Sequence, residues 1–177
     1  MERKMEPRVT FERAADHCGQ QTWICSSLPI EPKSIFRLIR SAGTQIGGTA
    51  EHLISTRLSK IASGPMRYRV GFINVSTLPA GLRYRDIDGL ISSHACSIPS
   101  IRVAIDLATM AEAILPYPHI LIWHHHVRLP RPGNPGKDAP YRLMVSGGKD
   151  GLALSALRTE GSSRIWRNVN AYAFVVP

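Results

Sequence analysis

Residues 101–123, the most apolar part of the chain, restrict its fold more than any other segment. Charged residues interrupt the segment three times, and Pro116 and Pro118 break it, so it lacks the run of about 20 apolar residues that a membrane-spanning helix needs. The pattern instead predicts a helix over 100–115, which the prolines end, and a strand over 119–129. A buried helix beside a buried strand indicates a globular core.

Hydrophobic periodicity predicts the other elements. Two further helices are expected at 34–41 and 49–62, and a short one at 150–158. Residues 130–140 contain four prolines and two glycines, which favours a loop. The further strands are expected at 67–76, 82–91, 141–145 and 169–176.

These expectations combine into one fold class. The sequence predicts a single compact α+β domain, with about three helices and a mixed, mainly antiparallel sheet of four to five strands. Residues 1–33 are interpreted as an N-terminal arm that wraps the domain, and residues 34–177 as the domain itself.

Net charge narrows the classes of partner. The chain has 22 Lys and Arg residues against 13 Asp and Glu, which gives a formal charge of +9. A surface this basic attracts polyanions, which include nucleic acid, anionic membranes and acidic proteins. Three irregularly spaced cysteines and the lack of an apolar leader favour an intracellular, reducing compartment, and no transmembrane helix is expected.

Two tripeptides, Arg67-Tyr68-Arg69 and Arg83-Tyr84-Arg85, are the leading candidates for contact with a polyanion. In a strand, residues two apart share a face, so each tripeptide would place two guanidiniums on one side and a tyrosine on the other. If the two segments formed a hairpin, four arginines could converge on phosphate oxygens, and a tyrosine could stack on a base. The alternative is an exposed face of solvated arginines, partly paired with Asp86 and Asp88. A second basic patch could combine Arg37, Arg40, Arg57 and Lys60.

The run His124-His125-His126 offers a metal site. On the expected strand, His124 and His126 would share a face and could bind one divalent metal. A His-x-His strand resembles the metal-binding motif of the rolling-circle replication and relaxase endonucleases. That resemblance implies a metal-dependent nuclease with a tyrosine nucleophile, for which Tyr141 and Tyr172 are the candidates. The alternative is a strand end with exposed histidines.

A glycine-rich loop follows the strand expected at 141–145. Its sequence, Ser146-Gly147-Gly148-Lys149-Asp150-Gly151, resembles the phosphate loop of the N-type ATP pyrophosphatases. The resemblance implies a phosphate held at the start of the expected helix at 150–158. The alternative is a strand-to-helix turn in which Asp150 caps the helix.

The leading functional interpretation is a basic, non-enzymatic structural or assembly protein that binds nucleic acid or an anionic membrane and self-associates as a homo-oligomer. Its composition is typical of viral matrix or packaging proteins, which is an analogy of composition alone. No cofactor is expected beyond the divalent metal at His124 and His126. Two other classes stay open: a metal-dependent nucleic-acid-processing enzyme, and a module that binds an acidic protein partner.

Overall fold

The computed structural model describes residues 8–16, 19–28, 31–78, 84–93, 96–110, 115–159 and 169–176. Its strands are β1 (Arg8–Asp16), β2 (Gly19–Leu28), β3 (Gln45–Ile46), β4 (Gly64–Asn74), β5 (His119–Ile122), β6 (Val127–Arg131), β7 (Asn134–Gly148), β8 (Gly151–Arg158) and β9 (Ala171–Val176). Its helices are α1 (Pro32–Ser41), α2 (Gly48–Arg57), α3 (Tyr84–Ser93) and α4 (Arg102–Ala108), with short 3₁₀ turns at Leu58–Lys60 and Val75–Thr77.

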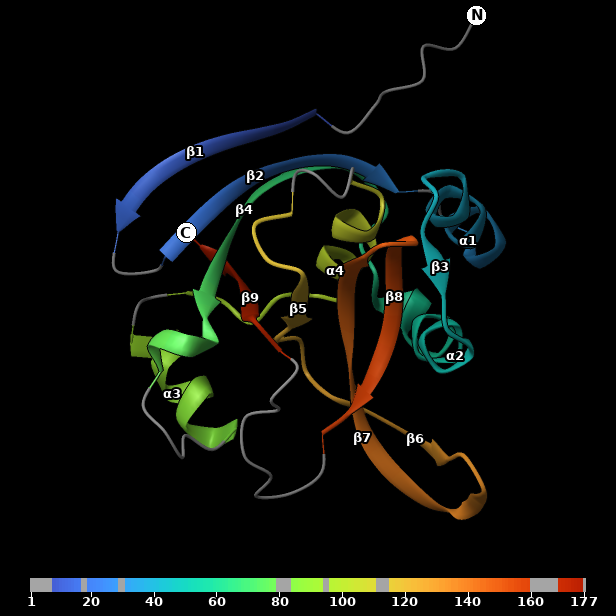
Figure 1. Cartoon of the computed structure of the whole chain (residues 1–177). Coiled ribbons are helices and arrows are strands. Elements are labelled where there is room, and N and C mark those ends of the chain that lie inside the picture. The colour runs from blue at the N-terminus through green and yellow to red at the C-terminus, as the bar shows by residue number, and fades with distance from the viewer. Residues whose placement is uncertain are drawn as a thin grey trace, which may run out of the picture.

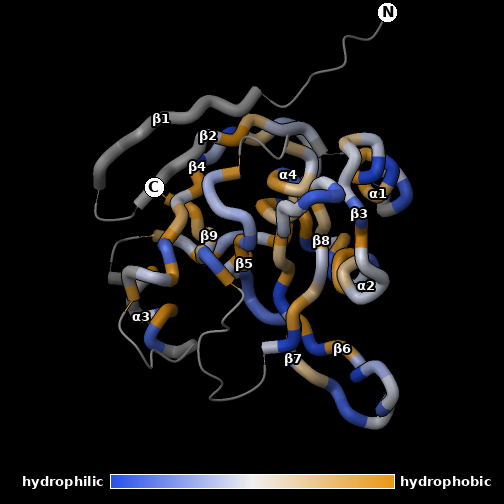
Figure 2. Tube along the Cα trace, viewed as in Figure 1, coloured by the Kyte–Doolittle hydropathy of each residue, from blue (hydrophilic) through white to orange (hydrophobic). Residues whose placement is uncertain are grey.

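The strands form one mixed sheet in the order β1-β2-β4-β9-β5-β7-β8-β3, and β6 pairs with β7 beside this path (Figure 1). The pairs β5–β9 and β3–β8 are parallel, and the others are antiparallel. The β6–β7 hairpin extends beyond the body of the protein, and Figure 2 colours its turn mainly hydrophilic.

Two apolar layers cover the two faces of the sheet. The larger layer packs α1, α2 and α4 on one face through residues such as Ile39, Leu53 and Ile105. The smaller layer packs α3 on the other face through Ile87 and Ile91. In β5 the side chains alternate between the two layers, because successive residues of a strand point to opposite faces.

Gly71 of β4 lets the smaller layer lie close to the sheet. A Cβ atom at Gly71 would lie 2.7 Å from side-chain atoms of Phe174 and Val176, well inside van der Waals contact. The register places Gly71 opposite Phe174, so the aromatic ring covers the space that a side chain would fill. This glycine is therefore required by packing, since its backbone is ordinary strand.

The expected α+β fold with four to five strands is wrong, because the described residues form nine paired strands and a sheet-rich structure. Residues 150–158, expected as a helix, form β8, and the expected loop at 130–140 forms much of the β6–β7 hairpin. The strand expected at 82–91 is also wrong, because the chain forms the helix α3 from Tyr84 onward.

Strand pairing and side-chain burial explain why β8, the β6–β7 hairpin and α3 differ from the expected elements. Full pairing of β8 with β7 outweighs the helix propensity of its alanines and leucines. Pro130 fits in β6 because β6 pairs only with β7 among the described strands, which leaves its other edge unpaired. Pro140 stands in β7 just before the pairing of β7 with β8 begins at Tyr141. In α3, Ile87 and Ile91 stand four residues apart, the spacing that buries one face of a helix.

The segment interpreted as an arm contributes two strands to the sheet. β2 pairs with β4 from Gln20 to Leu28, and β1 pairs with β2 at the end of the sheet order. The division into an arm at 1–33 and a domain at 34–177 stays a prediction.

Candidate functional site

Trp23, Arg67 and Arg69 form one surface, which we call the Arg–Trp surface. The register of β2 and β4 places Trp23 opposite Arg69 and Cys25 opposite Arg67, so the three side chains stand on the same face of the sheet. The guanidinium carbon of Arg67 lies 4.6 Å from the centroid of the Trp23 ring, and that of Arg69 lies 5.6 Å from it. Both distances are typical of cation–π contacts.

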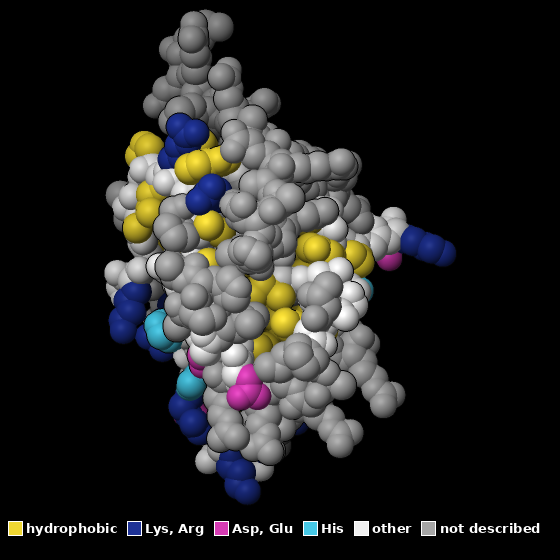
Figure 3. All heavy atoms as spheres, turned by 90° about the vertical axis from the view of Figure 1, so that its left-hand side faces the viewer, with side chains coloured by type: hydrophobic (Ala, Val, Ile, Leu, Met, Phe, Trp, Pro, Cys, Tyr) yellow, Lys and Arg dark blue, Asp and Glu magenta, His cyan; other side chains and the backbone are white. Residues whose placement is uncertain are grey.

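The three side chains of the Arg–Trp surface differ in how much of them water reaches. Arg67 is exposed, whereas Trp23 and Arg69 are half-buried. The neighbouring strand β1 places the backbone of Arg8 opposite Cys25, in the row that contains Arg67. Figure 3 shows the left-hand side of the view in Figure 1, where some Lys and Arg side chains lie next to hydrophobic ones. The surface therefore combines fixed positive charge with a flat aromatic group.

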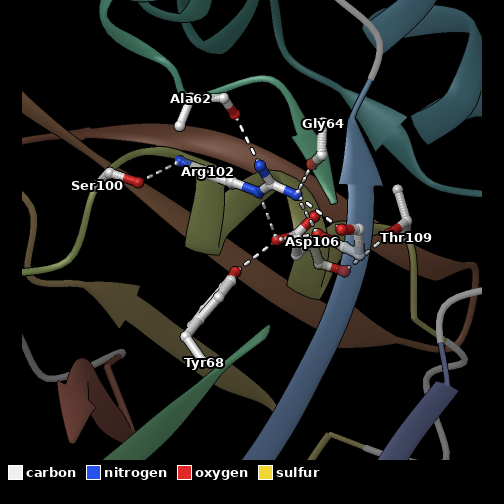
Figure 4. A network of polar contacts seen from close by, with 8 residues as sticks. Ala62, Gly64, Tyr68, Ser100, Arg102, Asp106 and Thr109 are labelled. Carbon is white, nitrogen blue, oxygen red and sulfur yellow. Dashed lines mark hydrogen bonds and ion pairs between the residues drawn. The ribbon is translucent and has the colours of Figure 1, made fainter. Parts of the chain in front are cut away.

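Tyr68 points to the opposite face and belongs to a buried polar network (Figure 4). Its hydroxyl donates a hydrogen bond of 2.5 Å to Oδ2 of Asp106, and Ser26 Oγ donates one of 2.8 Å to the same oxygen. Burial and the Asp106 carboxylate raise the pKa of Tyr68 far above its usual value. Tyr68 is thus unavailable for stacking on a base.

Arg102 completes this network. Its Nε lies 3.4 Å from Oδ2 of Asp106, and its other nitrogens donate to the carbonyl oxygens of Ala62, Gly64 and Ser26 at 2.7–2.9 Å. Burial raises the pKa of Asp106, against the opposing effect of its hydrogen bonds and of Arg102. Both residues are almost fully buried, so the network is a structural tie between α4, β2 and the start of β4.

The second Arg-Tyr-Arg segment does not form a hairpin strand with the first. Tyr84 and Arg85 begin α3, Arg83 lies outside the described residues, and no side-chain position is described for Tyr84 or Arg85. The expected convergence of four guanidiniums from two paired strands is therefore wrong in its geometry.

The second predicted patch is divided between two helices and a 3₁₀ turn. Arg37 and Arg40 are exposed on α1, and Arg40 forms an ion pair with Glu51 of α2. Arg57 ends α2 and is half-buried, and Lys60 is exposed in the following turn. Because Glu51 neutralises part of the charge of Arg40, this patch carries less positive charge than its sequence suggests.

Strand β5 ends at Ile122, so His124 and His126 lie in the connection to β6 rather than on a strand. His124 is buried, and both of its ring nitrogens face the backbone. Nε2 accepts a hydrogen bond of 2.8 Å from Leu143 N–H, and Nδ1 lies 2.6 Å from the carbonyl oxygen of His125. Metal binding through His124 would have to break one of these hydrogen bonds.

The structure also bears on the other residues that a metal-dependent nuclease would need. Among the described residues, no group of three or more His, Cys, Asp and Glu side chains is arranged to hold a metal ion. Tyr141 and Tyr172 are both buried, and burial raises the pKa of Tyr172 to about 12. A nucleophilic role for either tyrosine would first require its exposure.

The glycine-rich loop closes a hairpin. Residues up to Gly148 belong to β7 and residues from Gly151 to β8, so Lys149 and Asp150 form a tight turn in which Gly151 has φ +93°. The residues that directly follow the loop form β8 and not a helix, so the expected helix N-terminus that would hold a phosphate is not formed at residue 150. Along the described ranges, no helix is long or apolar enough to cross a membrane.

The chain was compared with protein-family models, with curated proteins and with solved structures. None of the three comparisons gave a match. The chemistry of the described side chains therefore carries the functional proposal.

Of the site residues described above, the sequence analysis missed Trp23, because the first 33 residues were interpreted as an arm to which no particular strand was assigned. The alternation of Trp23 and Cys25 around the buried Ile24 was the available signal. The pair Arg102 and Asp106 was likewise visible as an i, i+4 spacing of opposite charges within the expected helix.

Proposed function

We propose that the protein binds single-stranded nucleic acid on the Arg–Trp surface and that it does so without catalysis. The observation that carries the proposal is the placement of two guanidiniums over one indole ring, at 4.6 and 5.6 Å. Arginine at such a site can hold a phosphate oxygen through its N–H groups, and its flat guanidinium can stack on a base.

Single-stranded nucleic acid fits this surface better than a membrane does. Insertion into a bilayer needs exposed apolar side chains, but the large hydrophobic residues exposed in the described ranges are only Met66 and Ile98, at 40% and 38%. Unpaired bases, by contrast, offer faces for stacking beside a charged backbone. The formal charge of +9 supports attraction to either polyanion.

The test is a titration of a fluorescently labelled short oligothymidylate, followed by anisotropy at several salt concentrations. We expect Arg67→Ala and Arg69→Ala each to weaken binding several-fold. Each should also reduce the slope of log K against log salt by about 0.7, because one phosphate contact is lost from a single strand. Lys149→Gln removes an exposed positive charge from the β7–β8 turn and serves as the matched control.

Two results would overturn the proposal. One is equal loss of affinity in Lys149→Gln and in the two arginine variants, which would show attraction by net charge alone. The other is binding to vesicles that contain phosphatidylserine together with no binding to the oligonucleotide, which would assign the surface to a membrane.

A further inference from the structure

The Arg–Trp surface and the buried polar network occupy opposite faces of the same two strands. Ser26 belongs to β2, which also carries Trp23. Tyr68 stands between Arg67 and Arg69 on β4. Because successive residues of a strand point to opposite faces, Ser26 and Tyr68 share the face that lies against α4, away from the two arginines. The network therefore lies directly beneath the surface that we propose to bind nucleic acid.

One oxygen atom holds both strands (Figure 4). Oδ2 of Asp106 accepts hydrogen bonds from the hydroxyl of Tyr68 on β4, at 2.5 Å, and from Oγ of Ser26 on β2, at 2.8 Å. Nε of Arg102 lies 3.4 Å from the same oxygen, and Nη2 of Arg102 donates to both oxygens of Ser26 at 2.8 and 2.9 Å. Among the described residues, Oδ1 of Asp106 is buried and has no hydrogen-bond partner. The attachment of β2 and β4 to α4 thus depends on a single carboxylate oxygen at this point.

A proton on Asp106 would weaken this attachment. Oδ2 already accepts from three donors, so the proton would bind to Oδ1 and leave Oδ2 as a neutral carbonyl oxygen. A neutral acceptor forms hydrogen bonds about half as strong as an ionised one does. Burial raises the pKa of Asp106, while the hydrogen bonds from Tyr68 and Ser26 and the charge of Arg102 oppose that rise. Asp106 therefore takes up its proton at a higher pH than an ordinary aspartate does.

We propose that Asp106 is a positioning residue of the Arg–Trp surface: its ionised carboxylate holds β4 at Tyr68 and β2 at Ser26, and protonation or loss of this carboxylate lets the two guanidiniums and the indole leave their arrangement. Asp106 touches no ligand itself, since it is almost fully buried beneath the sheet. The inference rests on the proposed function, because its effect is measured as affinity for nucleic acid, and it adds control of that affinity by one buried group.

The positioning role predicts an effect opposite in sign to that of net charge. Asp106→Asn removes a negative charge, so electrostatic attraction alone would strengthen the binding of a polyanion. We expect the variant instead to bind oligothymidylate about fivefold more weakly than the wild type at pH 8, which is the lower end of the coupling between two sites in one protein. Asp150→Asn removes an exposed negative charge from the β7–β8 turn and is the matched control, with affinity equal to or above that of the wild type. An affinity of Asp106→Asn at or above the wild-type value would overturn the proposal.

The pH profile separates the charge of Asp106 from its mere presence. The protonation of Asp106 is followed by NMR of its carboxyl carbon, and the affinity for oligothymidylate is measured at the same pH values. The ratio of the wild-type affinity to that of Asp106→Asn should fall from about five toward one as Asp106 takes up its proton, because the carboxylic acid and the amide are both neutral acceptors. Histidines that gain charge over this range affect both proteins and cancel in the ratio. A wild-type advantage that outlasts the protonation of Asp106 would contradict the proposal.

A milder variant tests the same link if Asp106→Asn does not fold. Tyr68→Phe removes one hydroxyl group and keeps the pair of Arg102 and Asp106. The loss of this hydrogen bond should weaken the binding of oligothymidylate about twofold or more at pH 8. Tyr117→Phe removes a hydroxyl from a half-buried tyrosine outside the network and should leave the affinity unchanged. An undiminished affinity in Tyr68→Phe would show that the network does not position β4.

A measurement without nucleic acid separates this inference from the proposed function. In the free wild-type protein, the indole N–H resonance of Trp23 should shift as Asp106 is protonated, and in Asp106→Asn it should stay in place over the same pH range. If Trp23 follows Asp106 but Arg67→Ala and Arg69→Ala bind oligothymidylate as the wild type does, the proposed function fails and the positioning role stands. If the arginine variants bind more weakly but Trp23 does not respond to Asp106, the positioning role alone is overturned.

Discussion

His124 and Leu143 are joined by a hydrogen bond of 2.8 Å, in which the backbone N–H of Leu143 donates to Nε2 of the imidazole. Nε2 must therefore carry a lone pair, and the proton of the neutral ring sits on Nδ1, which faces the carbonyl oxygen of His125 at 2.6 Å. Burial is the main reason that the pKa of His124 falls to about 4. The folded protein thus keeps His124 neutral and uses it to fix the β5–β6 connection against β7.

This neutral histidine predicts a pH dependence of stability. An unfolded chain protonates His124 near pH 6.5, whereas the folded chain does so only near pH 4. Between these values the unfolded state binds more protons, so stability falls as the pH falls from 6.5 to 4. The loss should reach about 3 kcal/mol from this residue. Urea unfolding at several pH values measures it.

Two measurements check the assignment to His124. The variant His124→Gln removes the titrating group and should flatten the pH dependence in this window, while His52→Gln, at an exposed position, should leave it intact. NMR of the folded wild type should show the Nδ1–H tautomer at neutral pH. A pKa of His124 near 6.5 in the folded protein would contradict the account.

The buried pair Arg102 and Asp106 predicts strong coupling between two substitutions. Arg102→Met leaves a buried carboxylate without its cation and releases the carbonyl oxygens that Arg102 binds, which should cost about 3–5 kcal/mol. The double variant Arg102→Met/Asp106→Leu should be more stable than Arg102→Met, because no buried charge is left. Urea unfolding of the four proteins in the cycle measures the coupling, and additive losses would argue against the network.

Gly71 predicts a loss of stability from a single methyl group. Gly71→Ala would place a Cβ atom 2.7 Å from Phe174 and Val176, so we expect about 1–3 kcal/mol of destabilisation by overpacking. Gly89→Ala in α3 is the matched control, because nothing lies within 4 Å of its Cβ position. Helix propensity should make that variant up to about 1 kcal/mol more stable.

Thermal unfolding measures both glycine variants. Adding Val176→Ala to Gly71→Ala should recover part of the loss, since it removes one of the atoms that the new methyl group meets. Equal stabilities of Gly71→Ala and Gly89→Ala would show that the close packing of Phe174 on β4 is not as described.

The fold shows which sequence signals were sufficient. The strand at β5 could be predicted, because its apolar side chains alternate between two buried layers. β8 could not, since its alanines and leucines suit a helix equally well and only the pairing with β7 decides. α3 was missed because Asp86, Asp88 and Gly89 obscure the spacing of Ile87 and Ile91. For β8, a long-range contact thus overrode a weak local preference.

The residues of the Arg–Trp surface were likewise predictable only in part. Alternation alone places Arg67 and Arg69 on one face of β4 and Tyr68 on the other. The partner Trp23 lies 44 or more residues away in sequence, and its position depends on the register of β2 with β4.

The most direct test of nucleic-acid binding on the Arg–Trp surface is the indole N–H resonance of Trp23 during a titration with oligothymidylate. The resonance is assigned by its loss in Trp23→Phe. Trp123 provides the internal reference, because it is fully buried and donates its indole N–H to Asp88. We predict that the Trp23 resonance shifts in proportion to the bound fraction while that of Trp123 stays in place; saturation of binding without a shift of Trp23 would contradict the proposed surface.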